Sequence, residues 1–184
     1  MIYFVRHGST DWNEHLDENG KLSPRCQGRI DIPLNKNGIS QAENLKDELK
    51  GIKFDKIFCS PLSRAKQTCE IIVGNMNNVV IDERLIERDF GEFEGLTRDQ
   101  FDFQGFCRDE TSGFVKAETI QSLRNRVFSL LDELKQEPHK NILIVSHGAV
   151  GCIFSSYFEG VPSNGDYFKL LVSNGKIIKK EFKK

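Results

Sequence analysis

Short apolar runs alternate along the chain with longer segments in which apolar positions recur every three or four residues. Four short runs end abruptly at polar residues, as buried strands do, at 2–5, 56–59, 79–81 and 141–145. Four longer segments have the apolar spacing of amphipathic or buried helices, at 38–50, 60–73, 118–135 and 148–157. Helices between successive strands predict an α/β fold, a three-layer sandwich with a mainly parallel central sheet and helices on both faces.

Residues that start or end helices and turns refine this outline. Gly51 supplies a stop for the first helix, and Ser60 followed by Pro61 predicts an N-cap with proline at the first helical position of the second. The stretch 83–114 is rich in Gly, Phe and charge and predicts at most a short helix, near 97–103. The runs 167–172 and 176–180 flank an Asn-Gly pair, which predicts a C-terminal antiparallel hairpin. Without a repeat or linker, residues 1–184 are expected to form a single domain.

Composition excludes several classes of protein. With 38% hydrophobic and 29% charged residues, the chain is expected to fold into a globular core. A net charge of -1 argues against a nucleic-acid partner. No apolar stretch approaches the roughly 20 residues that a bilayer requires, and the N-terminus lacks the features of a signal peptide. Five cysteines without a CxxC pair predict reduced thiols, no zinc site and a cytoplasmic location.

Reactive side chains cluster just after the predicted strands. Arg6 and His7 follow the first strand, Arg64 lies in the first turn after the second, Glu87 comes after the third, and His147 follows the fourth. Ligands of open α/β sheets bind at the carboxyl ends of the strands, so these five residues are expected at one site. Each alone has a structural alternative: a strand-end histidine, half of a surface ion pair, or a solvated loop acid.

The motifs around these residues resemble the histidine phosphatase superfamily, also called the phosphoglycerate mutase-like family. The matching segments follow one another in order over nearly the whole chain. They are Arg6-His7-Gly8-Ser9-Thr10 with Asp11-Trp12-Asn13; Pro33-Leu34-Asn35 through Gly38 to Gln41-Ala42; Ser60-Pro61-Leu62-Ser63-Arg64-Ala65 with Gln67-Thr68; Leu85-Ile86-Glu87 with Gly91 and Glu94-Gly95; and Val145-Ser146-His147-Gly148. The resemblance implies a phosphatase that hydrolyses phosphomonoesters through a phosphohistidine, with no metal ion or other cofactor.

The residue types suit that chemistry. Phosphoryl transfer depends mainly on positioning and on stabilising charge, and arginine binds phosphoryl oxygens through its planar fork. We therefore assign this role to Arg6 and Arg64, and that of nucleophile to His7, whose imidazole is available unprotonated near neutral pH. His147 is expected to donate to a phosphoryl oxygen.

The remaining roles follow the same resemblance. Glu87 is expected to protonate the leaving alcohol and then to activate the water that breaks the phosphohistidine. Asn13 and the backbone of Gly148 and Ala149 are expected to be further phosphate donors.

Some features depart from the family pattern. The segment 14–25 is longer than usual and is polar, so a surface loop is expected, and it hangs from the catalytic loop close enough to border the site. Cys152 stands where many relatives have an arginine. We consider Arg29, Arg108 and Lys116 as contacts to an anionic part of the substrate.

The expected partner is a small-molecule phosphomonoester, with inorganic phosphate as the product, and no membrane is involved. Two alternatives remain: a cofactor-dependent phosphoglycerate mutase-type phosphotransferase and an inactive regulatory protein that binds phosphate esters. The natural substrate and the oligomeric state stay open.

Overall fold

A central sheet organises the molecule. The computed structural model describes residues 1–108, 116–136, 141–163 and 165–182, and within them five strands form one sheet in the order β3-β2-β4-β1-β5. The strands are β1 (Ile2–Arg6), β2 (Lys56–Cys59), β3 (Val79–Ile81), β4 (Ile142–Ser146) and β5 (Ile177–Lys180). The first four are parallel, and β5 pairs antiparallel with β1.

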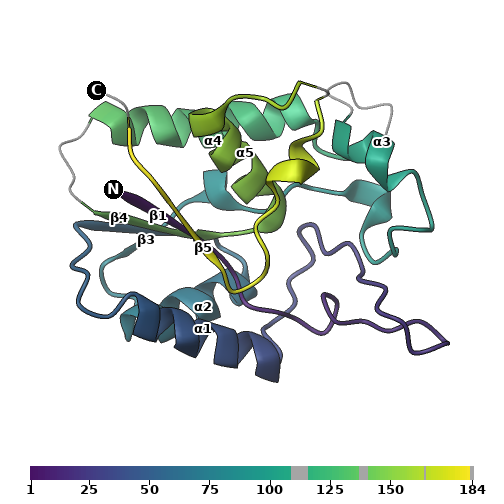
Figure 1. Cartoon of the computed structure of the whole chain (residues 1–184), viewed down its shortest axis with the longest axis horizontal. Helices are drawn as coiled ribbons and strands as arrows, with labels where there is room; N and C mark the ends of the chain where they lie inside the picture. Colours follow the sequence, from purple (N-terminus) through teal and green to yellow (C-terminus); the bar gives the residue numbers. More distant parts are fainter. Residues whose placement is uncertain (109–115, 137–140, 164, 183–184) are drawn as a thin grey trace.

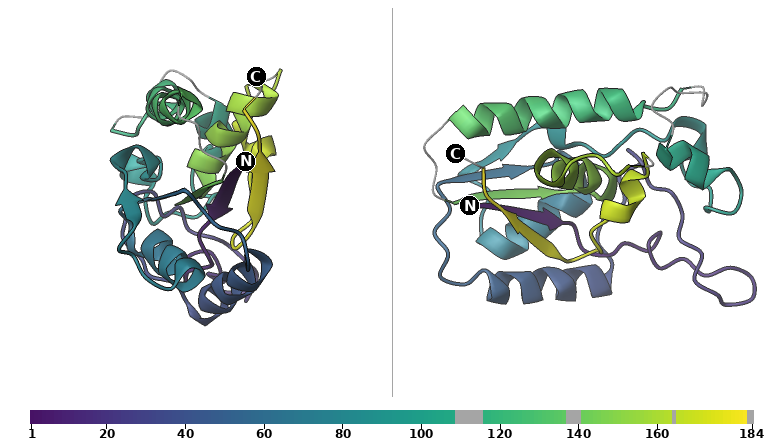
Figure 2. Two further views of the ribbon diagram at one scale, coloured as in Figure 1. Left: turned by 90° about the vertical axis from the view of Figure 1, so that its left-hand side faces the viewer. Right: turned by 45° about the horizontal axis from the view of Figure 1, so that its top comes forward.

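Helices cover both faces of the sheet (Figures 1 and 2). On one face lie α1 (Lys36–Glu48) and α2 (Ser63–Val73); on the other lie α4 (Ile120–Gln136) and α5 (Gly148–Glu159). In β4, Leu143 and Val145 join the core under α1 and α2, whereas Ile142 and Ile144 join the core under α4 and α5. The three-layer α/β prediction is confirmed. None of the described helices is long and apolar enough to cross a membrane.

Short helices gather around the end of the sheet where the parallel strands finish. They are η1 (Glu83–Leu85), η2 (Gly91–Phe93), α3 (Phe103–Arg108) and η3 (Tyr167–Leu170). The long loop between β1 and α1 extends beyond the same end (Figure 1), where Arg25 forms an isolated antiparallel bridge with Thr97. These segments therefore surround the edge at which the reactive side chains were expected.

Two helix starts differ from the prediction. Ser60 is not an N-cap: α2 begins at Ser63 after Leu62, because the Ser60 amide extends the sheet ladder by donating to Val145 O over 3.0 Å. The short helix expected at 97–103 instead runs from Phe103 to Arg108.

The C-terminal antiparallel strand is present, but its partner is different from the one expected. Residues 167–170 form the 3₁₀ helix η3, capped by the Asp166 side chain, which accepts from the Phe168 amide over 3.2 Å. Strand β5 instead pairs with β1 along the edge of the sheet. The turn at Asn174 and Gly175 leads the chain into that edge, so the local turn signal was read correctly while its strand partner was set by the tertiary fold.

Candidate active site

A pocket opens beyond the carboxyl ends of β1 and β4. It encloses about 810 Å³ counted to its open mouth, and Arg6, His7, Arg64 and Glu87 all line it. Among the described residues that line it, Glu87 is the one acid, against five arginines at positions 6, 25, 64, 88 and 98. A concave site with this balance of charge attracts anions.

His7 is held with one ring nitrogen occupied. Its side chain is buried, and Nδ1 lies 2.6 Å from the carbonyl oxygen of Gly8. A carbonyl only accepts, so Nδ1 carries the proton and Nε2 keeps its lone pair. Burial, followed by the charges of Arg64 and Arg6, lowers the pKa of His7 well below 6.5, which keeps the imidazole neutral at neutral pH.

Close backbone packing fixes the loop that carries His7. A Cβ on Gly8 would lie 2.3 Å from the carbonyl oxygen of Gly38, so the loop and the start of α1 approach through two glycines. The Gly8 amide donates to Thr68 Oγ1 over 3.1 Å, and the Ser9 amide donates to Gln41 Oε1 over 2.8 Å. Side chains from α1 and α2 thus set the position of the loop that carries His7.

Two arginines flank His7 with anchored guanidinium groups. Arg64 is fully buried and donates to Gly28 O over 2.7 Å and to Ile30 O over 2.8 Å. Arg6 donates to Val172 O over 2.7 Å. Within the described part of the chain, Nε of both arginines is buried without a partner.

Both guanidinium groups remain cationic at neutral pH. Burial lowers the pKa of Arg64 to about 10, although Glu87 and Asp31 oppose this effect. Burial also lowers the pKa of Arg6, which Glu87 again opposes. A buried donor without a partner is costly, so the two free Nε–H groups are suited to an anionic ligand.

His147 packs edge-on against His7 and is not among the described residues that line the pocket. The ring centroids are 5.1 Å apart, and His147 is fully buried. Its Nε2 lies 2.6 Å from Ser60 Oγ, while Nδ1 has no partner in the described structure. Burial, followed by the charge of Arg64, lowers the pKa of His147 well below 6.5. Sequence reasoning read Ser60 as a helix cap and missed this contact, because its partner lies 87 residues away.

Glu87 reaches the pocket from the segment after η1 and meets the start of α5. Its Oε1 accepts from the Arg88 amide over 2.9 Å, and its Oε2 accepts from the Ala149 amide over 3.2 Å. Gly148 and Ala149 both line the pocket, as expected, but the Ala149 amide is already engaged by Glu87. Among the residues described, no three His, Cys, Asp or Glu side chains are grouped as metal ligands would be.

Asn13 also lines the pocket, and a residue that sequence reasoning missed orients it. The Oδ1 atom of Asn13 accepts from the Thr10 amide over 3.1 Å and from Asn174 Nδ2 over 3.3 Å. Asn174 Nδ2 also lies 3.2 Å from the carbonyl oxygen of His7. Asn174 was read only as a turn residue, and no local signal distinguishes the two roles.

The arginines that border the pocket besides Arg6 and Arg64 are not those expected. Arg25, Arg88 and Arg98 line it, whereas Arg29, Arg108 and Lys116 do not. Lys116 lies 3.2 Å from Glu92, and Arg29 is engaged with acidic residues. The loop 14–25 does border the site, because Pro24 and Arg25 line it.

The side of the pocket formed by α3, η3 and the helices α4 and α5 is apolar. Arg98 lies over the rings of Phe103 and Phe168, at 4.7 and 5.1 Å from their centroids. Cys152 faces this side, and burial raises the pKa of its thiol, so it stays neutral where an arginine would carry charge. The other apolar lining residues are Phe90, Phe106, Ile120, Leu123, Ile153, Tyr167 and Leu171.

Known proteins with similar sequences and structures include phosphatases, in agreement with an anion-binding pocket. Residues 2–184 match the histidine phosphatase superfamily (branch 1). The chain is 36% identical over 150 residues to the uncharacterized phosphatase PhoE of Bacillus subtilis, covering 80% of this chain and 72% of that one. It is 32% identical over 173 residues to the probable phosphoglycerate mutase GpmB of Proteus mirabilis, covering 89% and 76%. The structure matches the alpha-ribazole phosphatase of Shigella flexneri with a TM-score of 0.78 at 27% identity, covering 96% and 87%. The chain is therefore a phosphatase that belongs to the histidine phosphatase superfamily.

Proposed function

We propose that this phosphatase hydrolyses a small phosphomonoester through a phosphohistidine on Nε2 of His7, without a metal ion. The observation that carries the proposal is the neutral His7 ring, whose Nδ1 is held by Gly8 O while Arg6 and Arg64 flank it. A lone pair directed into a cationic pocket is what attack on a dianionic phosphoryl group requires.

In the first step, Nε2 of His7 attacks phosphorus and the bond to the ester oxygen breaks. Glu87, in its protonated form, gives its proton to that oxygen, so the leaving group departs as an alcohol. Arg6 and Arg64 donate to the equatorial oxygens, using the Nε–H groups that are buried without partners in the described chain. Asn13 donates through its amide nitrogen, since its Oδ1 already accepts from Thr10 and Asn174.

His147 is proposed to donate from Nδ1. If the Ser60 hydroxyl donates to Nε2 over the 2.6 Å contact, the imidazole proton must reside on Nδ1, the atom that has no partner in the described structure. His147 can thus donate to a phosphoryl oxygen as a neutral imidazole, and it need not carry a positive charge beside two arginines.

In the second step, Glu87, now a carboxylate, takes a proton from a water molecule whose oxygen attacks phosphorus. The phosphorus–nitrogen bond breaks, inorganic phosphate leaves, and His7 returns to its neutral form. The Ala149 amide, 3.2 Å from Glu87 Oε2, helps to keep the carboxylate in place between the two steps.

The leaving group is proposed to be apolar or aromatic. The rings of Phe103, Phe106 and Phe168 line the pocket, and burial of a matching apolar group gains about 25 cal/mol per Å². Arg98, which lies over two of these rings, is available to an aromatic or anionic substituent.

A mutase-type phosphotransferase is the second candidate, and the likeness to GpmB, named as a probable phosphoglycerate mutase, supports it. The two differ only in whether water or a second alcohol takes the phosphoryl group from His7. An inactive binding protein is disfavoured, because all five proposed catalytic residues are present. We place the enzyme in the cytoplasm, in keeping with its five free cysteines, four of them buried.

The deciding experiment is hydrolysis of 4-nitrophenyl phosphate in the presence of a chelator. We expect chelator-resistant activity in the wild type and in His139→Ala, whose histidine has no motif around it, and none in His7→Ala. Radiolabelled phosphoryl trapped on the wild type should be lost in acid and stable in alkali, as a phosphorus–nitrogen bond is. Activity surviving in His7→Ala would show that the nucleophile is another residue. Phosphoryl transfer to an added phosphoglycerate in preference to water would favour the mutase.

A further inference from the structure

We infer that Glu118 is a positioning residue for the proposed catalytic acid, because it holds the two arginines that fix the backbone of Glu87. The inference rests on the proposed role of Glu87. Glu118 does not line the pocket, so it acts through other residues and not on the substrate.

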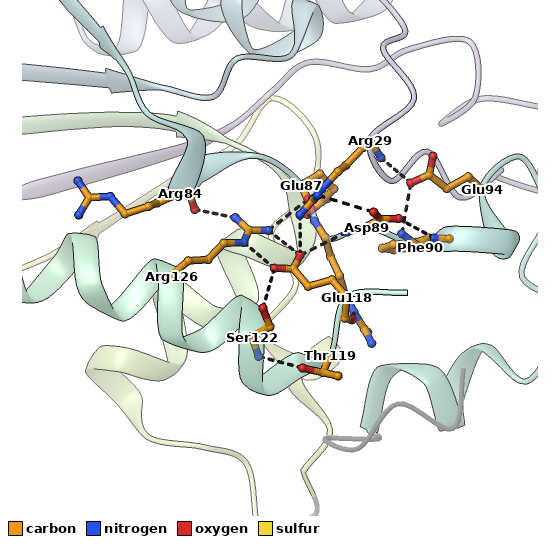
Figure 3. Close-up of polar contacts among 12 residues, drawn as sticks. Arg29, Arg84, Glu87, Asp89, Phe90, Glu94, Glu118, Thr119, Ser122 and Arg126 are labelled. Carbon is orange, nitrogen blue, oxygen red and sulfur yellow. Dashed lines mark hydrogen bonds and ion pairs between the residues drawn. The ribbon is translucent and has the colours of Figure 1, made fainter. Parts of the chain in front are cut away.

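The Glu118 carboxylate binds the side of the Arg126 guanidinium through both oxygens. Nε of Arg126 donates to Oε1 over 2.7 Å, and Nη2 donates to Oε2 over 2.8 Å (Figure 3). Arg29 Nη2 donates to the same Oε2 over 3.3 Å. The Glu118 side chain is only 7% exposed, so it links two guanidinium groups through charge-assisted hydrogen bonds that are partly shielded from water.

The same two guanidinium groups converge on the backbone of Glu87. Its carbonyl oxygen accepts from Arg126 Nη2 over 3.2 Å and from Arg29 Nε over 3.3 Å (Figure 3). Arg126 Nη1 also donates to the carbonyl oxygen of Arg84 over 2.6 Å. Two contacts from Arg126 on α4 and one from Arg29 thus hold the carbonyl oxygens of Arg84 and Glu87, which lie on one stretch of backbone.

The backbone of Glu118 adds two further ties. Its amide donates to Asp89 O over 2.9 Å, and its carbonyl oxygen accepts from Arg88 Nε over 2.8 Å. The backbone of Glu118 therefore holds the segment immediately after Glu87. Its side chain holds Glu87 indirectly, through Arg126 and Arg29. These hydrogen bonds hold the irregular segment between η1 and η2 in one conformation, although it has no helix or strand of its own.

The charge on Glu118 is part of the arrangement. Burial alone raises the pKa of Glu118, but the hydrogen bonds and charge of Arg126 and the charge of Arg29 outweigh it and lower the pKa below its ordinary value. The carboxylate keeps the two like charges of Arg29 and Arg126 beside one another. Without it they would repel, and the two donors on Glu87 O would separate.

Position matters more for a general acid than for most groups. Glu87 must reach the leaving oxygen at hydrogen-bond distance, and a displacement of about 1 Å can lower a rate about a hundredfold. An activated leaving group such as 4-nitrophenolate needs no proton, whereas an alkoxide does. A misplaced acid therefore slows alkyl phosphates much more than activated aryl phosphates.

The test compares kcat/KM for 4-nitrophenyl phosphate and 2-phenylethyl phosphate, since kcat/KM covers the steps through departure of the leaving group. We expect Glu118→Gln to lower kcat/KM for the alkyl ester at least about tenfold more than for the aryl ester. Glu92→Gln is the matched control: it removes an exposed carboxylate paired with Lys116, outside this network, and should leave the ratio unchanged.

The outcomes are separable. Glu87→Gln tests the proposed acid role by itself: if it does not discriminate between the two esters, the acid assignment fails. If Glu87→Gln discriminates and a folded Glu118→Gln lowers both esters equally or not at all, the positioning role is overturned. Should Glu118→Gln fail to fold, Arg29→Gln carries the same test, because the half-exposed Arg29 donates to Glu87 O while the Glu118–Arg126 pair stays intact.

Discussion

The side-chain amide of Asn174 donates to Oδ1 of Asn13 across 3.3 Å, although 161 positions separate the two residues. This contact leaves the amide nitrogen of Asn13 directed to donate elsewhere. Asn174 Nδ2 also lies 3.2 Å from the carbonyl oxygen of His7, so one side chain in the turn before β5 helps to hold both the proposed nucleophile and a proposed phosphate donor in place.

We predict that Asn174→Ala lowers kcat/KM about tenfold, since a single neutral hydrogen bond contributes about 0.5–1.5 kcal/mol. Steady-state kinetics with 4-nitrophenyl phosphate measure this. The exposed neighbour Ser173 supplies the control, and Ser173→Ala should behave as the wild type. Equal activity of the two variants would show that Asn174 serves only the turn.

Arg64 should be needed for the hydrogen-bond geometry of its planar guanidinium and not only for its positive charge. We predict that Arg64→Lys lowers kcat by about 10²–10³, because a compact ammonium lacks the planar fork with which the guanidinium reaches Gly28 O, Ile30 O and a phosphoryl oxygen. Lys66→Met removes an exposed cation from the same helix and should change kcat little. Near-wild-type activity of Arg64→Lys would mean that the positive charge at this position is sufficient for catalysis and that the geometry of the guanidinium is not required.

Stability should fall as the pH drops below about 6.5. Burial lowers the pKa of both His7 and His147, so between the lowered values and 6.5 the unfolded chain binds protons that the native protein does not. The stability is thus present above pH 6.5 and is lost as pH falls, by up to about 1.4 kcal/mol per pH unit for each histidine. Urea unfolding between about pH 5 and pH 8 measures the slope. His147→Asn should reduce the slope, and a flat profile would contradict the burial of neutral histidines.

Gly8 should tolerate no side chain. A Cβ there would lie 2.3 Å from Gly38 O, so Gly8→Ala must displace the loop that carries His7. We expect Gly8→Ala to lose stability by about 1–3 kcal/mol and to lose most activity. Gly51, at φ +84 with open space around it, is the control, because Gly51→Ala incurs only backbone strain of about 1 kcal/mol and should keep full activity. Thermal unfolding and kinetics together distinguish the two effects.

The apolar side of the pocket should make the enzyme prefer substrates with an apolar leaving group. Phe103→Ala removes a ring that lines the pocket and lies under Arg98, so we expect KM for 1-naphthyl phosphate to rise about tenfold while KM for glycerol 2-phosphate stays nearly unchanged. Phe54→Ala is the control, since Phe54 packs against Tyr3 and does not line the pocket. An equal rise of KM for both esters would argue against an apolar leaving-group site.

The family motifs led to the pocket residues because these residues lie at the carboxyl ends of the parallel strands or in the segments that follow them. Arg6, His7 and Arg64 are placed by the ends of β1 and β2, and parallel strands bring such ends together wherever they occur in the chain. The substrate contacts could not be found in this way. Arg98 and Arg29 have the same charge and similar surroundings in the sequence, yet one lines the pocket and the other binds Glu118.

The sequence alone determined the order and type of most strands and helices, the three-layer arrangement and the set of reactive groups at one sheet edge. Apolar periodicity and strand-end residues are local properties, and they suffice for this. Only the tertiary structure decided that Ser60 contacts His147, that Asn174 orients Asn13, that β5 pairs with β1, and that Glu118 holds the arginines around Glu87. Each of these joins residues far apart in the chain, and such a contact depends on the packing of whole elements, which no local pattern of residues encodes.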